Sequence, residues 1–490
     1  MPDLLRTIFH VRDPTVRILH LSWIAFFLCF VVWFNQAALL GTISEALGLT
    51  EDQTKALFAL NVALTIPARV LIGMLVDRYG PRKIYTGLLA ASSLLCLGFA
   101  SAQTFEQLAL FRFLMGFVGA GFVIGIRLVS EWFPAKQVGL AEGIYGGWGN
   151  FGSAAAAFSL PSLALLFGGE DGWRYAIATT GLVAALYAVA FYRNVRDTPR
   201  GATYFKPKRS GGLEVTSWRD LSLYLAMNVP MYGALAVLTW RLSPASVDLL
   251  SFGAVYGLLA LLLGLFVLQS YQIYRINAER LTQGVPELHR YAFRQVAILD
   301  IAYMVGFGCE IAVASMLPYF YSVTFPGISS VTAGLLGGAF ASTNLIARPL
   351  GGWLSDRFGR RLTLSVAMCG MSLSFVGMSQ IDGSWPLWLA VLVTLLAGPF
   401  VQAANGAVYA IVPLIQRRMT GQIAGMVGAY GNVGGVLFLT ALAAFEYSLF
   451  FLVIAAAAAL CFVAVRLLRE PRGHLAEIQE DGTVQLIEVA

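Results

Sequence analysis

Long apolar runs, separated by polar or turn-rich breaks, divide most of the chain. A helix needs about 20 mostly apolar residues to cross a bilayer. Six runs of this kind precede, and six follow, a central pair at about 221–242 and 249–271. The pattern predicts an all-α integral membrane protein with about 14 transmembrane helices. The outer runs start near Val16, Lys55, Ile84, Gln107, Leu140 and Tyr175, and near Ala297, Val331, Leu362, Leu387, Gln422 and Tyr447.

The amino-acid composition excludes a soluble globular protein. Of the 490 residues, 58% are hydrophobic and 12% are charged, and the mean hydropathy is +0.72. An average soluble domain is about 25% charged, and no soluble core of this size hides so much apolar surface. The first run, from Val16 to about Leu40, is longer than the roughly 7–15-residue core of a signal peptide. We therefore expect a retained first spanning helix.

Residues that usually carry enzymatic chemistry are few and scattered. The five cysteines lie inside apolar runs without a C-x-x-C spacing, and the four histidines form no cluster. Neither a disulfide framework nor a metal site is indicated. The absence of a phosphate-cradling G-x-x-x-x-G-K-[ST] motif disfavours ATP-driven pumping. Because no spacing supplies a catalytic dyad either, an intramembrane enzyme is disfavoured and no cofactor is expected.

Lysine and arginine concentrate in alternate loops, which orients the chain by the positive-inside rule. The basic loops are 77–83, 357–361 and 417–418, together with linkers at about 193–209 and 274–295. An even number of spans puts both termini on this side, so we expect cytoplasmic termini in the cell inner (plasma) membrane. This asymmetry and the lipid headgroups of the bilayer account for the net charge of +6, which gives no support to nucleic-acid binding.

Two motifs recur at nearly the same distance along the chain. The pattern R-x-x-x-G-x-x-x-D-R-x-G-x-R at 69–82 returns 279 residues further on, at 348–361. The pattern G-x-x-x-G-x-x-G-x-x-G-N-x-G at 139–152 returns 282 residues further on, at 421–434. Two motifs at one offset predict two structural repeats of six helices each.

The repeats define the expected organisation of the chain. An N-terminal six-helix half covers 1–200, linkers with two additional helices cover 201–295, and a C-terminal six-helix half covers 296–468. A polar, solvated cytoplasmic tail covers 469–490. Because the two additional helices lie outside the repeat, we expect a peripheral hairpin that does not line the transport pathway.

The repeated motifs resemble those of a known family. The G-x-x-x-D-R-x-G-x-R loops at 73–82 and 352–361 resemble the signature of the major facilitator superfamily, and R-F-L-M-G at 112–116 resembles its second motif. The G-N-x-G helices, the first preceded by W-F-P at 132–134, are similar to the nitrate signatures of the nitrate/nitrite porter (NarK-type) family. The resemblance implies a major facilitator fold, with the central pair added to the common twelve-helix arrangement.

Two arginines lie inside apolar runs. Arg69 and Arg348 stand eight residues before Asp77 and Asp356, which puts each about 12 Å deeper along its helix. A membrane-embedded arginine is costly and a functional candidate by default. Its planar fork of donors fits a small planar oxyanion. Two facing arginines require an anion between them; the alternative is that each pairs with a buried carboxylate or carbonyl groups.

The resemblance also assigns roles to site residues. It implies that Arg69 and Arg348 clamp the substrate, and that Phe122, Tyr303 and Phe307 lie above and below the plane of the anion. A flat, weakly hydrated anion suits an aromatic slot, whereas ordinary core packing is the alternative for each ring.

Polar residues of the two repeated motifs complete the candidate set. Asn150 and Asn432 are amides within helices of small residues, and we expect them to donate hydrogen bonds to a passing anion. The surrounding glycines also suit close helix packing. Charged residues at helix ends on the basic side are expected to hold one conformation closed through ion pairs: Asp77, Arg78, Asp356 and Arg357.

Glu310 lies in the middle of a predicted span. It follows Phe307 by three residues and Tyr303 by seven, so the three share one helix face. A membrane-embedded carboxylate is costly when charged, and we expect Glu310 to exchange protons, in resemblance to proton-coupled family members. The alternative is a permanent ion pair with Arg112 or Arg127.

The sequence therefore predicts a secondary active transporter for nitrate and nitrite that functions as a monomer by nitrate/proton symport. Nitrate/nitrite antiport, transport of another small anion, and an anion-binding sensor remain the alternatives.

Overall fold

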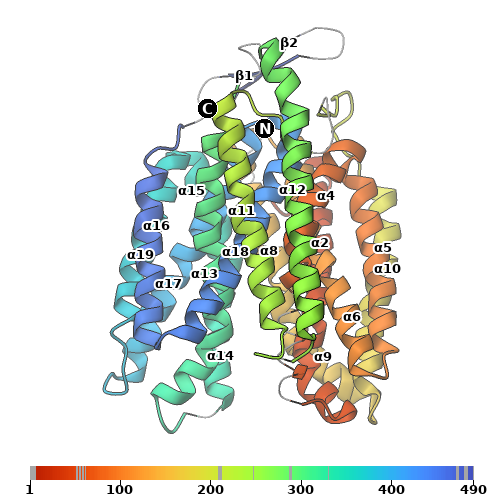
Figure 1. Ribbon diagram of the computed structural model, residues 1–490, viewed down its shortest axis with the longest axis vertical. Coiled ribbons are helices and arrows are strands. Elements are labelled where there is room, and N and C mark those ends of the chain that lie inside the picture. Colours follow the sequence, from red (N-terminus) through yellow and green to blue (C-terminus); the bar gives the residue numbers. More distant parts are fainter. Residues whose placement is uncertain are drawn as a thin grey trace.

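The computed structural model describes residues 7–50, 53–54, 57, 60, 62–207, 212–246, 248–285, 290–328, 330–470, 474–478 and 484–488. Long helices form two bundles that stand side by side, the first half of the chain in one and the second half in the other (Figure 1). We call the end of the molecule at which α10 and α12 finish the linker end.

The first bundle is built from helices with well-defined starts and stops. Pro14 begins α2 after the N-cap Asp13, whose side chain accepts a hydrogen bond from Thr15 N, and Gly48 ends the helix in a left-handed conformation. The helices are α2 (Pro14–Leu47), α4 (Thr65–Tyr79), α5 (Pro81–Ala100), α6 (Phe105–Met115), the 3-10 helix η1 (Gly116–Ala120), α7 (Gly121–Trp132), α8 (Val138–Asn150), α9 (Gly152–Phe167) and α10 (Gly172–Asn194).

The second bundle repeats this arrangement. Gly80 and Gly359 occupy the same place in the two halves, at the sharp turns that join α4 to α5 and α15 to α16, and their φ angles of 88° and 104° require glycine. The helices are α13 (Phe293–Thr324), α14 (Ser330–Ser342), α15 (Asn344–Phe358), α16 (Arg360–Met378), α17 (Leu387–Tyr409), the 3-10 turns η3 (Val412–Leu414) and η4 (Arg417–Met419), α18 (Thr420–Ala444) and α19 (Tyr447–Val465).

The number of continuous spanning helices is lower than the sequence predicts. Within the described residues, 12 helices are long and apolar enough to cross a membrane, against about 14 expected. The difference lies in the second run of each half. There α4 has 15 residues, and α14 and α15, which are separated at Thr343, have 13 and 15. None of the three is long enough to span on its own.

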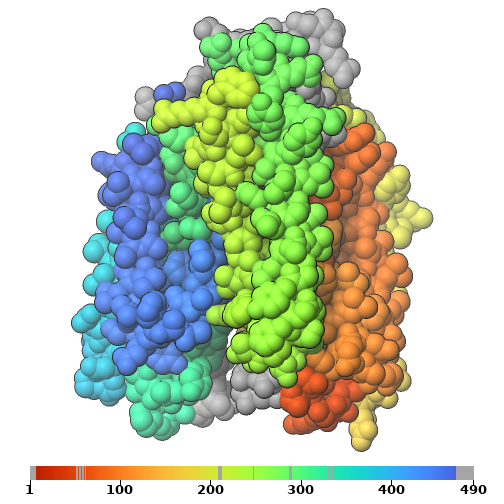
Figure 2. Space-filling model, in the orientation of Figure 1, coloured from red at the N-terminus to blue at the C-terminus, as the bar shows by residue number. Residues whose placement is uncertain are grey.

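The two additional helices pack together on one face of the molecule. In Figures 1 and 2, α11 (Trp218–Arg241) and α12 (Phe252–Gln283) run along the seam between the two bundles. Three residues of α12 are buried, Val255, Ile273 and Asn277, whereas α11 packs against α13 and α18. A cavity of about 340 Å³ lies between this pair and the bundles.

The tail is not purely irregular. Strands β1 (His474–Ile478) and β2 (Val484–Glu488) form an antiparallel hairpin in which Ala476 pairs with Leu486. The described membrane part of the chain is all-α, as expected, and this hairpin, held by a ladder of backbone hydrogen bonds, is an addition in the tail.

The bundles meet backbone to backbone at two crossings. A Cβ added to Gly73 of α4 would lie 2.3 Å from the carbonyl oxygen of Gly421 in α18. A Cβ added to Gly352 of α15 would lie 1.9 Å from the carbonyl oxygen of Gly139 in α8. The small residues of the repeated motifs therefore form the contact between the halves.

Candidate functional site

The two arginines predicted from the repeat come together in the middle of the molecule. Arg69 on α4 and Arg348 on α15 are each 1% exposed, and each guanidinium lies within electrostatic range of the other. Their Cζ atoms lie 5.8 Å and 5.3 Å from the centre of one ring, that of Phe122. Each half of the chain therefore contributes one positive charge to a single buried site.

Each arginine lies against a glycine of the opposite half. Arg69 donates to the carbonyl of Gly428 (2.5 Å) on α18 and to that of Gly119 (3.3 Å) in the 3-10 turn. A Cβ on Gly428 would come within 3.1 Å of the Arg69 side chain, and a Cβ on Gly146 within 2.8 Å of Arg348 Nε. The glycines of the G-N-x-G helices thus make room for the guanidinium groups.

Three aromatic rings form a parallel set at the arginines. The Tyr303 and Phe307 rings are 5.1 Å apart at 4°, and the Phe122 and Tyr303 rings are 6.3 Å apart at 3°. The Tyr303 hydroxyl accepts a hydrogen bond from Arg348 Nη2 (3.1 Å), and Phe307 lies beneath Arg69, whose Cζ is 5.4 Å from its centre. All three rings named from the sequence therefore belong to this site.

Two further aromatic residues were missed. Tyr409 at the end of α17 sets its ring edge-on to Phe122 (4.6 Å) and Tyr303 (4.9 Å). Tyr145 on α8 stacks on Phe122 (5.9 Å), and its hydroxyl donates to the carbonyls of Gly121 and Phe122. Tyr409 lies in an apolar run outside any motif, and Tyr145 occupies a variable position of the 139–152 motif, so each fits core packing equally well from the sequence.

Glu310 does not pair with Arg112 or Arg127. Its two oxygens instead accept hydrogen bonds from Asn344 Nδ2 (2.8 Å) and Asn405 Nδ2 (2.9 Å). Arg112 donates to the backbone carbonyls of Trp33 and Leu57. The alternative of a permanent ion pair with either arginine is therefore wrong. Asn344 and Asn405 are polar residues inside predicted apolar runs, and this feature of the sequence could have identified them as partners of Glu310.

The carboxylates near the site act on Arg348 and not on Arg69. Arg348 lies within electrostatic range of Glu310 and of Glu142, whereas the groups that act on Arg69 are phenols and Arg348. Among the described residues, Arg348 Nη1 is buried without a hydrogen-bond partner. A buried donor of this kind and an arginine on which no carboxylate acts together favour an anionic ligand.

The two asparagines behave differently from each other. Asn432 is fully buried, and its Nδ2 donates to the carbonyl of Gly428 (3.3 Å), the carbonyl that also accepts from Arg69. Its Oδ1 has no partner within the described part of the chain. Asn150 ends α8, where the chain turns at Phe151 into α9. Their role as donors to a substrate stays a prediction.

Asp77 and Asp356 join the two halves of the chain near the linker end. Asp77 on α4 accepts the backbone N–H groups of Gly421 (2.9 Å) and Gln422 (2.8 Å), in the first turn of α18. Asp356 on α15 accepts those of Gly139 (3.1 Å) and Leu140 (2.9 Å), in the first turn of α8. Carboxylates at helix N-termini are favourable because the exposed N–H groups carry partial positive charge.

The arginines next to these aspartates are not their partners, contrary to a simple reading of the motif. Arg78 lies over the Tyr79 ring, and Arg357 over the rings of Trp353 and Phe358. The ion pairs instead come from Arg127 with Asp77 (3.4 Å) and from Arg360 with Asp356 (3.7 Å). An arginine that directly follows an aspartate in a helix does not face it, since consecutive helical residues point to different sides.

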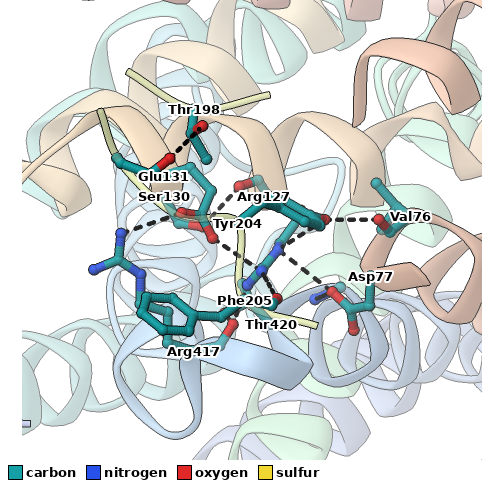
Figure 3. A network of polar contacts seen from close by, with 12 residues as sticks. Val76, Asp77, Arg127, Ser130, Glu131, Thr198, Tyr204, Phe205, Arg417 and Thr420 are labelled. Atoms are coloured by element: carbon teal, nitrogen blue, oxygen red, sulfur yellow. Dashed lines mark hydrogen bonds and ion pairs between the residues drawn. The ribbon is translucent and has the colours of Figure 1, made fainter. Parts of the chain in front are cut away.

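Arg127 is the centre of a network that joins both halves (Figure 3). It pairs with Glu131 (2.9 Å), which pairs in turn with Arg417 (3.1 Å), and it donates to the backbone carbonyl of Arg417 in the second half. The linker segment joins this network, since Tyr204 accepts from Arg127 Nε (3.2 Å) and donates to the Val76 carbonyl (2.7 Å). Burial raises the pKa of the Tyr204 phenol, which keeps it neutral and able to donate.

Comparison with known proteins shows which family the chain belongs to. The model of the Major Facilitator Superfamily matches residues 22–282 and 299–488. The nitrate/nitrite transporter NrtP of Nostoc punctiforme is 45% identical over 485 residues, covering 97% of this chain and 97% of that protein. The probable nitrate/nitrite antiporter NarK1 of Thermus thermophilus is 27% identical, covering 86% and 84% respectively. The crystal structure of the E. coli fucose:proton symporter FucP has a TM-score of 0.61 at 12% identity, covering 93% of this chain and 100% of that chain, and shows the fold alone.

The matches define a multi-pass membrane transporter rather than an enzyme. Within that class, this chain belongs to the nitrate/nitrite porter family of the Major Facilitator Superfamily.

Proposed function

We propose that this protein takes up nitrate, and also nitrite, by alternating access, with Arg69 and Arg348 as the anion clamp. The observation that carries this proposal is the pair of buried guanidinium groups that share the Phe122 ring, with Arg348 Nη1 left without a partner in the described structure. A planar oxyanion offers acceptors and no donors, which suits a site whose polar groups are mostly donors. The names of NrtP and NarK1 support the same substrates.

The parallel rings favour a flat anion over a tetrahedral one. Phe122 and Tyr303 face each other at 6.3 Å with an interplanar angle of 3°. Nitrate and nitrite are planar and weakly hydrated, so their faces lie against aromatic rings at little cost. Phosphate is bulkier and carries more strongly hydrated charge, and we expect the site to reject it. Asn150 and Asn432 complete the site by donating to the anion as it passes.

The proposed energy source is the proton gradient. An inside-negative potential opposes anion entry by about 2.3 kcal/mol per charge at 100 mV, so uptake needs a coupled ion. Bound nitrate reduces the positive charge around Glu310, which favours proton uptake by that carboxylate. Exchange of nitrate for internal nitrite avoids the electrical cost without a titrating group, and the name of NarK1, a probable antiporter, keeps this alternative open.

The proposal includes the topology in the membrane. We count α4 with the run before it, and α14 with α15, as two further spans, which makes 14 in all. The linker end is the cytoplasmic side of the plasma membrane, because the basic loops lie there. Asp77 and Asp356 form the cytoplasmic gate, with Arg78 and Arg357 flanking it, and one chain is sufficient for transport.

Uptake of labelled nitrate into proteoliposomes tests this function. We expect uptake to rise with an inward proton gradient, and unlabelled nitrite to compete more strongly than formate or phosphate. Binding of nitrate without uptake would instead indicate a sensor. Uptake that requires internal nitrite and ignores the pH gradient would establish antiport.

A further inference from the structure

Asp300 is a further carboxylate inside the membrane, and neither the sequence motifs nor the clamp accounts for it. Glu142 on α8 is also buried without a hydrogen-bond partner among the described residues, but it lies within electrostatic range of Arg348. No charged group of the described chain acts on Asp300 in this way. Asp300 lies on α13, within a candidate spanning segment, and is 0% exposed. Among the described residues, neither of its oxygens has a hydrogen-bond partner. An ionised carboxylate without donors or a counter-ion is too costly to bury in this way, so Asp300 holds a proton in this closed conformation.

The position of Asp300 ties it to the substrate site. Asp300, Tyr303, Phe307 and Glu310 fall within a sector of about 80° on the helix surface, at 100° per residue. Asp300 lies about 15 Å from Glu310 along the axis and nearer to the linker end. The anion site is therefore flanked by a carboxylate on each side, both on one face of one helix.

The two carboxylates have opposite surroundings. Glu310 accepts two amide N–H groups and lies within electrostatic range of Arg348, which stabilises its charged form. The titratable groups that face Asp300 from the packed helices are phenols, Tyr224 from α11, Tyr409 from α17 and Tyr430 from α18. Neutral phenols do not compensate a negative charge on Asp300, so Asp300 binds a proton of its own. Because the two carboxylates lie about 15 Å apart along the helix, this proton is separate from any proton on Glu310.

One of these phenols comes from the additional pair of helices. Tyr224 is buried on α11, and the same helix accepts a hydrogen bond at the Met227 carbonyl from Tyr430 (2.5 Å). Tyr409 reaches in the other direction, to the rings of Phe122 and Tyr303. Tyr224 of α11 therefore lies on one side of Asp300, and Tyr409 links Asp300 to the rings of the anion site on the other.

We propose that Asp300 is a second proton-binding residue of the transport cycle, so that two protons accompany each nitrate. This proposal rests on the proposed nitrate/proton symport. Each carboxylate binds one proton, and opening of the linker end gives water access to the shared face of α13, where Asp300 releases its proton. Two protons and one nitrate carry one net positive charge inward, so the membrane potential drives uptake instead of opposing it.

The proposal is tested by measuring current and proton uptake together. In proteoliposomes, nitrate should evoke an inward positive current in the wild-type protein, with two protons taken up per nitrate. Asp300→Asn should move one proton per nitrate, with no current, while the pH gradient still drives uptake. At 100 mV the variant should lose about 50-fold in nitrate accumulation, since one net charge is worth about 2.3 kcal/mol there. Asp171→Asn, an exposed carboxylate paired with Arg174 at the opposite end, is the matched control and should retain the ratio of two.

Two further measurements separate a functional loss from misfolding. Counterflow of labelled nitrate needs no net proton movement and should be retained in Asp300→Asn, and Asp300→Glu should restore the ratio of two. The infrared absorption of protonated carboxyl groups should be weaker in Asp300→Asn than in the wild-type protein, by the contribution of one group. An unchanged ratio in Asp300→Asn, or a wild-type ratio of one, overturns the role of Asp300 but leaves symport intact. A wild-type protein without proton uptake overturns symport itself.

Discussion

Asp77 and Asp356 make the same contact in opposite directions. Each carboxylate accepts two backbone N–H groups in the first turn of a helix that belongs to the other half of the chain. The contact needs no particular side chain on the accepting helix, only a free helix N-terminus. Separation of the two halves at the linker end would break both contacts, so we expect these two residues to stabilise the closed conformation.

The first prediction follows from this contact. Asp77→Asn replaces a charged acceptor by a neutral one. The amide has a single acceptor oxygen, so one of the two backbone N–H groups is left without an acceptor. Charge-assisted hydrogen bonds contribute about 1.5–3 kcal/mol each, so the opening equilibrium should rise by about 10–150-fold. Amide hydrogen exchange at 420–424 should accelerate accordingly, whereas Asp171→Asn should leave it unchanged. Exchange at wild-type rates would mean that Arg127 and its network hold the gate without the aspartate.

The second prediction concerns the anion clamp. Arg69→Lys and Arg348→Lys retain the charge but lose the planar fork of donors. In Arg348→Lys the ammonium group would no longer reach the Tyr303 hydroxyl in the same geometry. Loss of one or two charge-assisted bonds should weaken nitrate binding by at least tenfold in each variant. Equilibrium nitrate titration gives the affinities, and Arg174→Lys, at the opposite end from the linkers, is the matched control. Nitrate affinity at the wild-type level in both clamp variants would exclude bidentate recognition.

The third prediction separates binding from coupling. Glu310→Gln keeps a group that accepts from Asn344 or Asn405 but cannot change charge. Because the proton on Asp300 remains, uptake should still respond to the pH gradient. It should move one proton per nitrate and lose the acid stimulation that depends on Glu310, while nitrate binding and counterflow are spared. Uptake as a function of external pH gives the answer. If the variant accumulates nitrate with an unchanged pH profile, the nitrate-coupled proton does not reside on Glu310, and the antiport interpretation gains support.

The fourth prediction concerns the crossing of α8 and α15. A methyl group at Gly352 meets the Gly139 backbone at 1.9 Å, and a backbone cannot move aside as a flexible side chain does. Gly352→Ala should lower stability by at least 1–3 kcal/mol, as overpacking does elsewhere, or prevent full closure. Gly87→Ala is the control, because a Cβ there meets nothing within 4 Å. Thermal unfolding of both variants in detergent compares them directly; equal melting temperatures would refute the crossing as described.

The fifth prediction concerns the additional helices. Replacement of 218–283 by a flexible linker should leave nitrate binding intact, because no clamp or ring residue comes from α11 or α12. Stability should fall, since the Tyr430 hydroxyl loses the Met227 carbonyl and Tyr224 no longer covers Asp300. A folded, inserted variant that fails to bind nitrate would show that the pair contributes to the site.

The repeat in the sequence predicted the central site because equivalent positions in two halves must approach one another across the interface. Arg69 and Arg348 were found in this way, whereas Phe122, Tyr303 and Phe307 were named from the family resemblance; all five lie together. The ion-pair partners of Asp77 and Asp356 were not predicted. Arg127 reaches Asp77 through tertiary packing that no spacing encodes, and Arg360, only four residues after Asp356, lies beyond the turn at Gly359. Asp300 and Tyr409 were missed for another reason: each is a single residue in an apolar run, outside any motif.

The crossings at Gly73 with Gly421 and at Gly139 with Gly352 also bear on how the sequence can vary. No side chain stands between the backbones there, so every substitution adds volume where none is available, whatever anion is carried. A saturation library selected for growth on nitrate should therefore find these four positions as intolerant as the clamp arginines. The same library selected for a different transported anion should relax the arginines and the rings but keep the four glycines.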